Sequence, residues 1–596
     1  MKYLYYQFMV VNMPRLFVFL CYLFFASFFI QCNENNSLPK GDPDNGKLFL
    51  PDGFEALVVT DSIGSARHLA VNNNGDIYVK LRDAAPNSGN VGIRVGKDGR
   101  VDKVAYFGDY PVKGGYGPTG MRIYNDYLYF STGGAVYRNK LTPGKLVPES
   151  KIETILVDDY ENDVHGHEHI GKPLTFDDEG HMYVPFGAPS DVCQTTNRAP
   201  GLLGQNPCPE LSEHGGIWQF DANKLNQTQK DGKRYATGIR SVIAMDWDHT
   251  DNTLYALQHG RDAFNRAWPE LYTAWETAML PSEEFFRVKE GMDGGWPYYY
   301  YDQIKGKKLL NPEYGGDGKL EGKGDQYAQP IIGFPGHFAP NDLLFYTGNQ
   351  FPEHYRNGAF IAFHGSTIRA PYPQAGYCVC FVPFKNGAPS GPWEVFADGF
   401  AEKDTIVNPG DAAHRPMGLA MGPDGSLYIS DAVKGKIWRV MFRGDKDSFG
   451  IEQLAKMEKR KMRSNLKTPD PIKDNLDMGM AAEGENAYKT YCSTCHQGDG
   501  KGDGDRFPPL NGSEWVIGDK NRLIDVVLNG FEGPITVKGK SFNGVMPKHA
   551  FLDDAVVAQI LTYIRLNFTN NSSAIREAEV GRVRNKPTAQ SVNKNK

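Results

Sequence analysis

RPMGLAMGPDGSLYISD, residues 415–431, carries the pattern from which the fold can be predicted. An apolar run leads into Pro-Asp-Gly, and a second run follows in which apolar and polar residues alternate. Asp-Gly or Asn-Gly between two such runs is the strongest short-range signal of a β-hairpin. Residues 415–431 therefore predict two antiparallel strands joined by a tight turn.

The same pattern occurs five more times along the chain, at 66–83, 118–134, 169–187, 239–262 and 339–366. Each hairpin predicts one small antiparallel sheet, or blade, and such recurrence is typical of a repeat architecture. A radial arrangement of blades removes exposed sheet edges. We therefore expect an all-β six-bladed β-propeller over residues 49–442. A β-sandwich is the alternative, but it would need fewer hairpins and less regular spacing.

Polar residues stand where the first strand of each hairpin opens, namely Arg67, Thr119, His169, Arg240, Asn341 and Arg415. The first strands of propeller blades line the central channel, so these side chains should meet at one end of it. Singly, such a residue is more often structural. Together, three arginines and a histidine at equivalent positions favour a pocket for a small anionic ligand.

A different signal, YCSTCHQGDGKGDG, occupies residues 491–504. Cys492, Cys495 and His496 form C-x-x-C-H, the attachment motif of a c-type haem, with both thiols bonded to the haem and the histidine to its iron. Met546 is the only methionine between His496 and residue 570, and it is the expected sixth iron ligand. The alternatives are a core methionine and ligation by His549. A thioether ligand raises the haem potential, which suits an electron acceptor.

Residues 479–570 resemble a class I cytochrome c, with helical segments at both ends and the loop FPPLNG between them. A small all-α cytochrome c domain is therefore expected after the propeller. The charged segment 443–478 is interpreted as a linker. The polar tail 571–596 is expected to be disordered.

The N-terminus carries an apolar run, LFVFLCYLFFASFFIQC, that ends at Cys32. It is short for a membrane span and typical of a signal peptide. A cysteine at this junction resembles a bacterial lipoprotein signal, although Gln31 stands where a small residue is usual. We expect a signal peptide over 1–31, a lipid on Cys32, a polar tether over 32–48, and a membrane-anchored protein in the periplasm or at the cell surface. Plain secretion or an uncleaved anchor is the alternative.

Two of the remaining cysteines fit an oxidising compartment outside the cytoplasm. Cys193 and Cys208 flank a loop rich in proline and glycine, and a disulfide between them is expected. Cys378 and Cys380 are expected to be buried free thiols. The net charge of −6 offers no basic footprint for nucleic acid.

The propeller region resembles the sorbosone dehydrogenase family, relatives of soluble glucose dehydrogenases that use pyrroloquinoline quinone (PQQ). The resemblance lies in HIGKPLTFDDEGHMYVPFGAPSDVC, in TGIRSVIAMDW with QHGRD and GMDGGWP, in FAPNDLLFYTGNQFP with FIAFHGSTIR, and in HRPMGLAMGPDGSLYISDAVKGKIWRV. It implies a six-bladed propeller that binds PQQ and Ca²⁺.

The resemblance also implies roles for single residues. His169 matches the catalytic base, and Arg240 matches an arginine beside substrate and quinone. The backbone carbonyls of Gly260 and Arg261 match the turn that binds Ca²⁺. The residues expected to face the quinone carboxylates are Arg67, Arg240, His364, Arg369 and Arg415.

Three family motifs are altered. Ser241 follows Arg240 where asparagine is usual, QHGRD replaces DNGRD at 258–262, and HGSTIR replaces HGSWNR at 364–369. These changes bear on substrate contacts more than on quinone binding.

Together these features predict a PQQ-dependent dehydrogenase that oxidises a sugar or related aldehyde or alcohol. Histidine suits removal of the hydroxyl proton, arginine suits quinone carboxylates, and Ca²⁺ would polarise the quinone. The electrons would pass to the protein's own haem and then to a downstream cytochrome or oxidase. The alternatives are a Ca²⁺-dependent hydrolase or lactonase, which predicts clustered acidic ligands, and a non-catalytic carbohydrate-binding propeller.

Overall fold

The computed structural model describes residues 38–83, 88–110, 120–158, 168–269, 271–469, 475–570 and 572–585. The predicted signal peptide, Cys32, Thr119 and the end of the tail lie outside these residues. Among the described helices, none combines the length and apolar character needed to cross a membrane.

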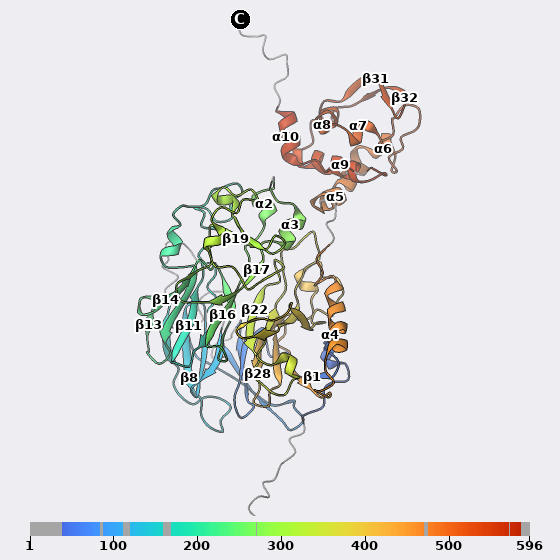
Figure 1. The fold of residues 1–596 in the computed structure, drawn as a ribbon. Coiled ribbons are helices and arrows are strands. Elements are labelled where there is room, and N and C mark those ends of the chain that lie inside the picture. Colours follow the sequence, from blue (N-terminus) through green and yellow to red (C-terminus); the bar gives the residue numbers. More distant parts are fainter. Residues whose placement is uncertain are drawn as a thin grey trace, which may run out of the picture. The chain divides into compact units, whose positions relative to one another are not determined.

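Within the described residues, six antiparallel blades surround a common axis (Figure 1). Their innermost strands are β2 (Ala66–Val71), β6 (Met121–Tyr124), β10 (Thr175–Phe176), β15 (Val242–Asp248), β22 (Pro340–Phe345) and β28 (Pro416–Met421). The second strands are β3 (Ile77–Leu81), β7 (Tyr127–Ser131), β11 (His181–Phe186), β16 (Thr253–Gln258), β23 (Ala359–Phe363) and β29 (Leu427–Asp431). The fold prediction of a six-bladed propeller is confirmed.

The third strands are β4 (Asn90–Val95), β8 (Ala135–Lys140), β12 (Gly216–Asp221), β17 (Glu283–Val288), β24 (Cys378–Val382) and β30 (Ile437–Phe442). The fourth strands are β5 (Val101–Phe107), β9 (Glu153–Val157), β14 (Lys233–Thr237), β21 (Ile332–Phe334), β27 (Glu394–Ala397) and β1 (Phe54–Thr60). Blades 1 to 6 are numbered below from the blade of β2 to the blade of β28. Short additions are β13 (Gln227–Thr228), β18 (Met292–Asp293), and the hairpins of β19 (Tyr299–Asp302) with β20 (Lys307–Leu310) and β25 (Phe384–Lys385) with β26 (Ala388–Pro389).

The turns of the hairpins explain why the sequence pattern predicts the strands correctly. In blade 6, Met421 pairs with Leu427 across the Pro-Asp-Gly turn. Gly425 in this turn has a φ of 81°, which a side chain with a Cβ rarely adopts. The local sequence therefore fixes the hairpin before any long-range contact forms.

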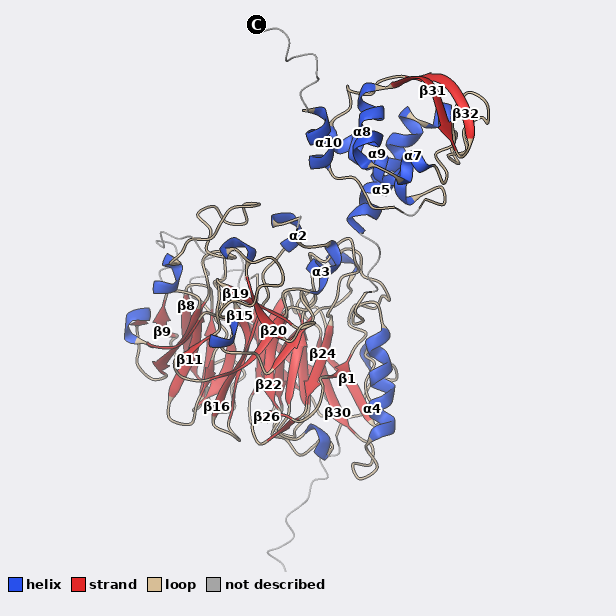
Figure 2. Cartoon of the chain, turned by 45° about the horizontal axis from the view of Figure 1, so that its top comes forward, coloured by secondary structure: helices blue, strands red, loops and turns tan. Residues whose placement is uncertain are grey.

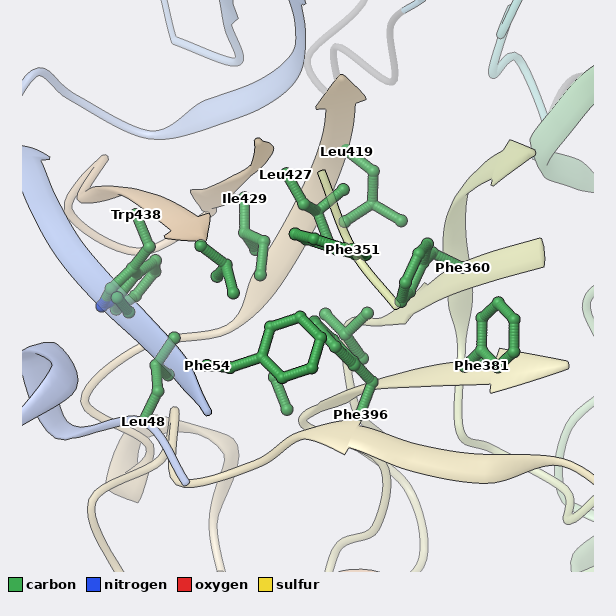
Figure 3. Close-up of a cluster of buried hydrophobic side chains, with 14 of the residues drawn as sticks. Leu48, Phe54, Phe351, Phe360, Phe381, Phe396, Leu419, Leu427, Ile429 and Trp438 are labelled. Atoms are coloured by element: carbon green, nitrogen blue, oxygen red, sulfur yellow. The ribbon is translucent and has the colours of Figure 1, made fainter. Parts of the chain in front are cut away.

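The ring is closed by the N-terminal strand, because β1 supplies the outer strand of blade 6. Phe54 of β1 pairs with Phe442 of β30. Its ring packs edge-on against Phe351 and Phe396, at centroid distances of 4.8 and 5.1 Å. Figure 3 shows this cluster, in which blade 5 and blade 6 share one apolar core.

Polar side chains link the inner strands across the axis. Arg122 donates from Nη2 to Oδ1 of Asp342 at 2.8 Å, and the other oxygen of Asp342 accepts from the backbone N–H of Leu419 at 2.8 Å. Nε2 of His68 lies 3.7 Å from Oδ1 of Asp342. His68 is only 1% exposed, and burial lowers its pKa to about 4. The imidazole is therefore neutral in the folded protein at physiological pH.

The C-terminal domain contains α5 (Asn475–Tyr491), α6 (Ser493–His496), α7 (Glu514–Ile517), α8 (Lys520–Asn529), α9 (Asp554–Leu566) and α10 (Glu577–Arg584). Helices α5 and α9 approach so closely at Gly484 that a Cβ there would lie 2.0 Å from the carbonyl oxygen of Gln559. A hairpin of β31 (Phe531–Val537) and β32 (Lys540–Met546) interrupts the otherwise helical domain, as Figure 2 shows. The domain expected to be all-α is thus mainly helical.

Two segments differ from the sequence prediction. The tail predicted to be disordered contains α10, because Val580 and Val583 are buried in the core of the C-terminal domain and Arg584 pairs with Asp554. The segment 443–478, predicted as a linker that is first helical and then extended, contains α4 (Ile451–Glu458), but its Met457 and Leu466 are buried against the propeller. Periodicity alone did not reveal either contact.

The short helices α2 (Phe264–Ala267) and α3 (Ala274–Met279) lie in the long loop of blade 4.

Replacing Phe54 with Ala should destabilise the propeller by roughly 3–5 kcal/mol, because the large cavity would lie in the cluster that closes the ring. Denaturant unfolding followed by tryptophan fluorescence measures this change. Leu225→Ala is the control, because Leu225 is 42% exposed and should change stability little. Equal stabilities of the two variants would contradict the closing role of β1.

The buried His68 predicts a loss of stability in acid. As pH falls from about 6.5 towards 4, the unfolded chain binds a proton at His68 and the folded protein does not, which removes roughly 3 kcal/mol of stability. Urea unfolding at pH 7 and 4.5 should show a smaller pH dependence for His68→Gln than for wild type. His249→Gln, a change at a half-exposed side chain, should keep the wild-type dependence.

Candidate functional site

A cavity of about 790 Å³ opens at one end of the propeller axis. Its walls include the predicted residues Arg67, His169, Arg240, Gly260, Asn341, His364 and Arg415. Every described residue predicted to open an inner strand therefore reaches this cavity. The convergence follows from ring closure, because the inner strands all begin at the same end of the axis.

The side of the cavity formed by blades 1, 5 and 6 is cationic. Arg67 and Arg82 come from blade 1, and Arg415 opens blade 6. Arg415 donates from Nε to the carbonyl oxygen of His364 at 3.0 Å and also contacts that of Gly365. Burial, together with repulsion from Arg82 and Arg415, lowers the pKa of Arg67 to about 9. Nε of Arg67 has no hydrogen-bond partner, so this wall fits a carboxylate.

His169 lies on the other side, at the start of blade 3. Its Nδ1–H donates to the carbonyl oxygen of Ala188 at 2.7 Å, and its Nε2 accepts from Nη1 of Arg240 at 2.8 Å. The first bond fixes the tautomer in which Nε2 holds a lone pair. Burial and the nearby charge of Arg240 lower the pKa of His169 to about 3, so the ring is neutral at physiological pH.

Arg240 is the most connected group in the cavity and is only 4% exposed. Its Nη1 donates to Oδ1 of Asp191 at 2.5 Å, and its Nη2 donates to the carbonyl oxygen of His259 at 3.0 Å and also to that of Gly260. A buried guanidinium needs such a carboxylate, since an unpaired buried charge is costly. Sequence reasoning did not identify Asp191, which lies in a loop.

A disulfide holds the loop that carries Asp191. Cys193 and Cys208 are bonded, with Cα atoms 6.0 Å apart. The N–H of Cys193 also donates to Oγ of Ser190 at 2.8 Å, and Nε1 of Trp296 donates to the carbonyl oxygen of Asp191 at 2.9 Å. The carboxylate of Asp191 is thereby kept under the guanidinium of Arg240.

In the turn predicted to bind calcium, Gly260 and Arg261 make contacts with other protein groups. The carbonyl oxygen of Gly260 accepts from Arg240, and the guanidinium of Arg261 pairs with Glu313 at 2.5 Å and does not line the cavity. Glu283 accepts from the backbone N–H of Gly260 at 2.8 Å, and burial raises the pKa of Glu283 to about 7. The guanidinium of Arg240 already holds the carbonyl oxygen of Gly260, one of the two carbonyls that the family assigns to Ca²⁺, so this donor set does not fit the ion as arranged.

One predicted quinone contact, Arg369, is not brought to the cavity. Its Nε donates to the carbonyl oxygen of Ala278 on α3 at 2.9 Å, and burial lowers its pKa to about 10. Thr367 and Ile368 line the wall in its place. The expectation for Arg369 is corrected: the loop after blade 5's second strand turns this side chain towards α3.

Loop residues complete the cavity beside His169. Arg198 contacts Glu168 at 3.1 Å and Asp262 at 3.4 Å. Nε2 of His337 donates to the carbonyl oxygen of Thr277 at 2.7 Å. Of these, the sequence offered a signal only for Asp262, at the end of QHGRD. The others follow no repeat position, so strand patterns could not identify them.

A second cavity lies in the C-terminal domain and contains the four predicted haem residues, Cys492, Cys495, His496 and Met546. Nδ1 of His496 donates to the carbonyl oxygen of Pro508 at 3.0 Å, which leaves Nε2 for a metal. Both cysteines are free thiols, and the rest of the wall is largely apolar. These residues fit a covalently attached haem.

Comparison with known proteins agrees with this two-part architecture, a propeller of dehydrogenase type followed by a cytochrome. Residues 116–370 match the Glucose / Sorbosone dehydrogenase family, and 318–442 match a TrAA12-like family. Residues 479–564 match the Cytochrome C oxidase, cbb3-type, subunit III family. The chain thus contains a glucose/sorbosone dehydrogenase domain and a C-terminal cytochrome c domain, as the resemblance predicted.

Relatives match only parts of the chain. Cytochrome c-552 of Thermus thermophilus is 41% identical over 87 residues, which are 14% of this chain and 66% of that protein. An uncharacterized protein of Borreliella burgdorferi is 27% identical over 220 residues, which are 37% of this chain and 51% of that protein. The chain therefore spans between half and two thirds of the length of these curated relatives.

Solved structures support the propeller fold. The holo form of the pyranose dehydrogenase PQQ domain from Coprinopsis cinerea is 16% identical, with a TM-score of 0.52 over 66% of this chain and 97% of its own. The calcium structure of Trichoderma reesei Carbohydrate-Active Enzymes Family AA12 is 17% identical, with a TM-score of 0.53 over 66% of this chain and 97% of its own. At these identities the likeness concerns the fold.

Replacing Met546 with His should lower the haem potential, because a nitrogen ligand replaces a thioether while Cys492 and Cys495 still hold the haem. A spectroelectrochemical titration measures the potential. Phe551→His is the control, since Phe551 is 69% exposed and is not part of the cavity wall. A wild-type potential in Met546→His would exclude Met546 as the ligand.

Proposed function

We propose that the protein is an extracytoplasmic, PQQ-dependent dehydrogenase that oxidises a sugar or a related aldehyde or alcohol and transfers the electrons to its own c-type haem. The observation that supports this most directly is the pairing, in one cavity, of a fixed neutral histidine with a wall of arginines. A hydrolase would instead need clustered acidic metal ligands. Among the described residues, such a cluster occurs at Asp177, Glu179 and His181, which are not part of the cavity wall.

The arginines suit the cofactor. PQQ carries three carboxylates, and Arg67, Arg82 and Arg415 would bind them by charge-assisted hydrogen bonds. When bound, PQQ would supply a two-electron acceptor for hydride. The solved Coprinopsis domain is described as a PQQ domain, which supports the same assignment for this propeller. The resemblance also implies Ca²⁺, but the proposed proton removal and electron transfer do not use this ion.

Proton removal would fall to His169. The Nε2 lone pair of His169 accepts a hydrogen bond from Nη1 of Arg240. A substrate hydroxyl that replaces this donor would give its proton to Nε2. The ring is neutral over the physiological range, so Nε2 keeps the lone pair that accepts a proton. Arg240 would orient the substrate oxygen, while Asp191 stabilises the guanidinium throughout.

Electrons would leave one at a time through the haem held by Cys492 and Cys495, and a soluble cytochrome or a terminal oxidase would accept them. We further propose that a lipid on Cys32 anchors the protein to the membrane. The expected disulfide between Cys193 and Cys208, which the structure contains, suits a protein outside the cytoplasm.

His169→Gln should slow oxidation of the substrate by about 10²–10⁴-fold, because glutamine keeps a hydrogen bond but removes the proton acceptor. Stopped-flow absorbance of the haem, with PQQ-loaded protein and a panel of aldoses and aldehydes, measures the rate. Binding of PQQ and haem reduction by a chemical reductant should be unchanged. His181→Gln, outside the cavity, is the matched control.

Substrate-driven haem reduction at the wild-type rate in His169→Gln would remove this residue from catalysis. If the wild-type protein reduces its haem with no compound of the panel, the proposed dehydrogenase function is wrong.

A further inference from the structure

Residues 451–469 contact the side of the propeller throughout most of their length and are called the strap here. The strap consists of α4, the 3₁₀ turn Lys459–Met462 and the extended residues up to 469. Figures 1 and 2 show α4 running beside blade 6. Met457 and Leu466 are 4% and 3% exposed and belong to the apolar core of blades 4 and 5.

Polar contacts fix the strap further. Nε and Nη2 of Arg460 donate to Oδ2 of Asp398 at 3.0 and 2.5 Å, and the Asp398 side chain is only 5% exposed. Nζ of Lys461 donates to the carbonyl oxygen of Trp393 at 2.7 Å. A shielded ion pair of this kind, in which two guanidinium nitrogens donate to one carboxylate oxygen, has more geometric specificity than a solvent-exposed pair.

The end of the strap reaches the back of the cavity wall. Asn465 donates from Nδ2 to the carbonyl oxygen of Gly376 at 2.9 Å, and the N–H of Gly376 donates to the carbonyl oxygen of Asn465 at 2.9 Å. Gly376 in turn touches Gly365, since a Cβ added to Gly376 would lie 2.9 Å from the Cα of Gly365. Gly365 lines the cavity.

A second contact places residue 469 at the same end of the propeller. Nε1 of Trp275, on α3, donates to the carbonyl oxygen of Pro469 at 2.7 Å. Two residues further along α3, the carbonyl oxygen of Thr277 contacts Nε2 of His337, which lines the cavity. The strap thus ends directly behind the cavity wall, separated from lining residues by Gly376 at one point and by α3 at the other.

We propose that the strap anchors the tether of the haem domain at the cavity end of the propeller, and so keeps the haem near the site that reduces it. This role rests on the proposed function. From the anchored Pro469 to the first residue of α5, six residues can span at most about 21 Å. A free tether with the full length of 443–478 would be about six times longer. Because effective concentration falls as roughly the −3/2 power of tether length, anchoring raises the haem concentration at the cavity about 15-fold.

Fluorescence quenching tests the anchor without relying on catalysis. A fluorophore is attached to Thr367→Cys, an exposed position on the cavity wall, and quenching by the haem of the same chain reports their separation. Cys378 and Cys380 are buried and should not be labelled. Two variants should lose much of the quenching. The triple variant Arg460→Glu/Asn465→Ala/Leu466→Asp releases the strap from the propeller. A Gly/Ser insertion of thirty residues after Pro469 lengthens the tether and leaves the strap bound.

Glu452→Lys is the matched control, because the Glu452 side chain is exposed on α4 and its change should not release the strap. Hydrogen exchange should be slow over 451–467 in wild type and in the insertion variant, and fast in the triple variant. Wild-type quenching in both lengthened proteins, or fast exchange over the strap of the wild type, would overturn the proposal.

Kinetics separates this inference from the proposed function. In PQQ-loaded protein, the released and lengthened variants should reduce their own haem about 15-fold more slowly, with unchanged reduction of a small artificial acceptor. Equal haem reduction in all proteins would overturn the strap's role alone. Failure of every protein to reduce the artificial acceptor would refute the dehydrogenase, and the quenching experiment would still decide whether the strap is an anchor.

Discussion

The pairing of β1 with β30 is the constraint on which the rest of the propeller depends. It joins the two ends of the propeller sequence in blade 6, and an edge-on aromatic cluster around Phe54 seals the seam. Once the ring is closed, the inner strands are held around one axis and begin at the same end. Residues hundreds of positions apart, such as Arg67 and Arg415, are thereby forced into one cavity. Their mutual repulsion is tolerated because the closed ring holds their backbones in place.

Within the cavity, the buried pair of Arg240 and Asp191 organises the chemistry. The guanidinium simultaneously contacts Nε2 of His169 and the carbonyl oxygens of His259 and Gly260. One side chain therefore controls both the expected base and the turn that the family assigns to calcium. The Cys193–Cys208 disulfide holds the loop of Asp191 and thereby keeps the carboxylate that balances the charge of Arg240 in place.

The cavity also divides its charges between two sides. Blades 1 and 6 contribute Arg67, whose Nε has no hydrogen-bond partner, and Arg415, which donates to carbonyl oxygens, and this suits an anionic cofactor. Blades 3 and 4 contribute arginines paired with Asp191, Glu168 and Asp262, which suits a neutral, hydroxyl-bearing substrate. The strap leads from this end of the propeller to the haem domain, so its place on the surface agrees with transfer of electrons within one chain.

The sequence alone determined the features that depend on neighbouring residues: the tight turns at positions such as Gly425, the hairpins that build the blades, the polar residues opening the inner strands, and the haem-binding set of Cys492, Cys495 and His496. Only the tertiary structure decided the contacts between distant segments. No repeat or periodicity in the sequence predicts these contacts. They are the contact of Asp191 with Arg240, that of Glu283 with Gly260, that of Arg369 with α3, and the packing of the strap and of α10. The physical reason is that a turn is fixed by the φ and ψ preferences of a few adjacent residues, whereas the partner of a buried charge or apolar side chain is fixed by whichever distant segment the closed fold brings against it.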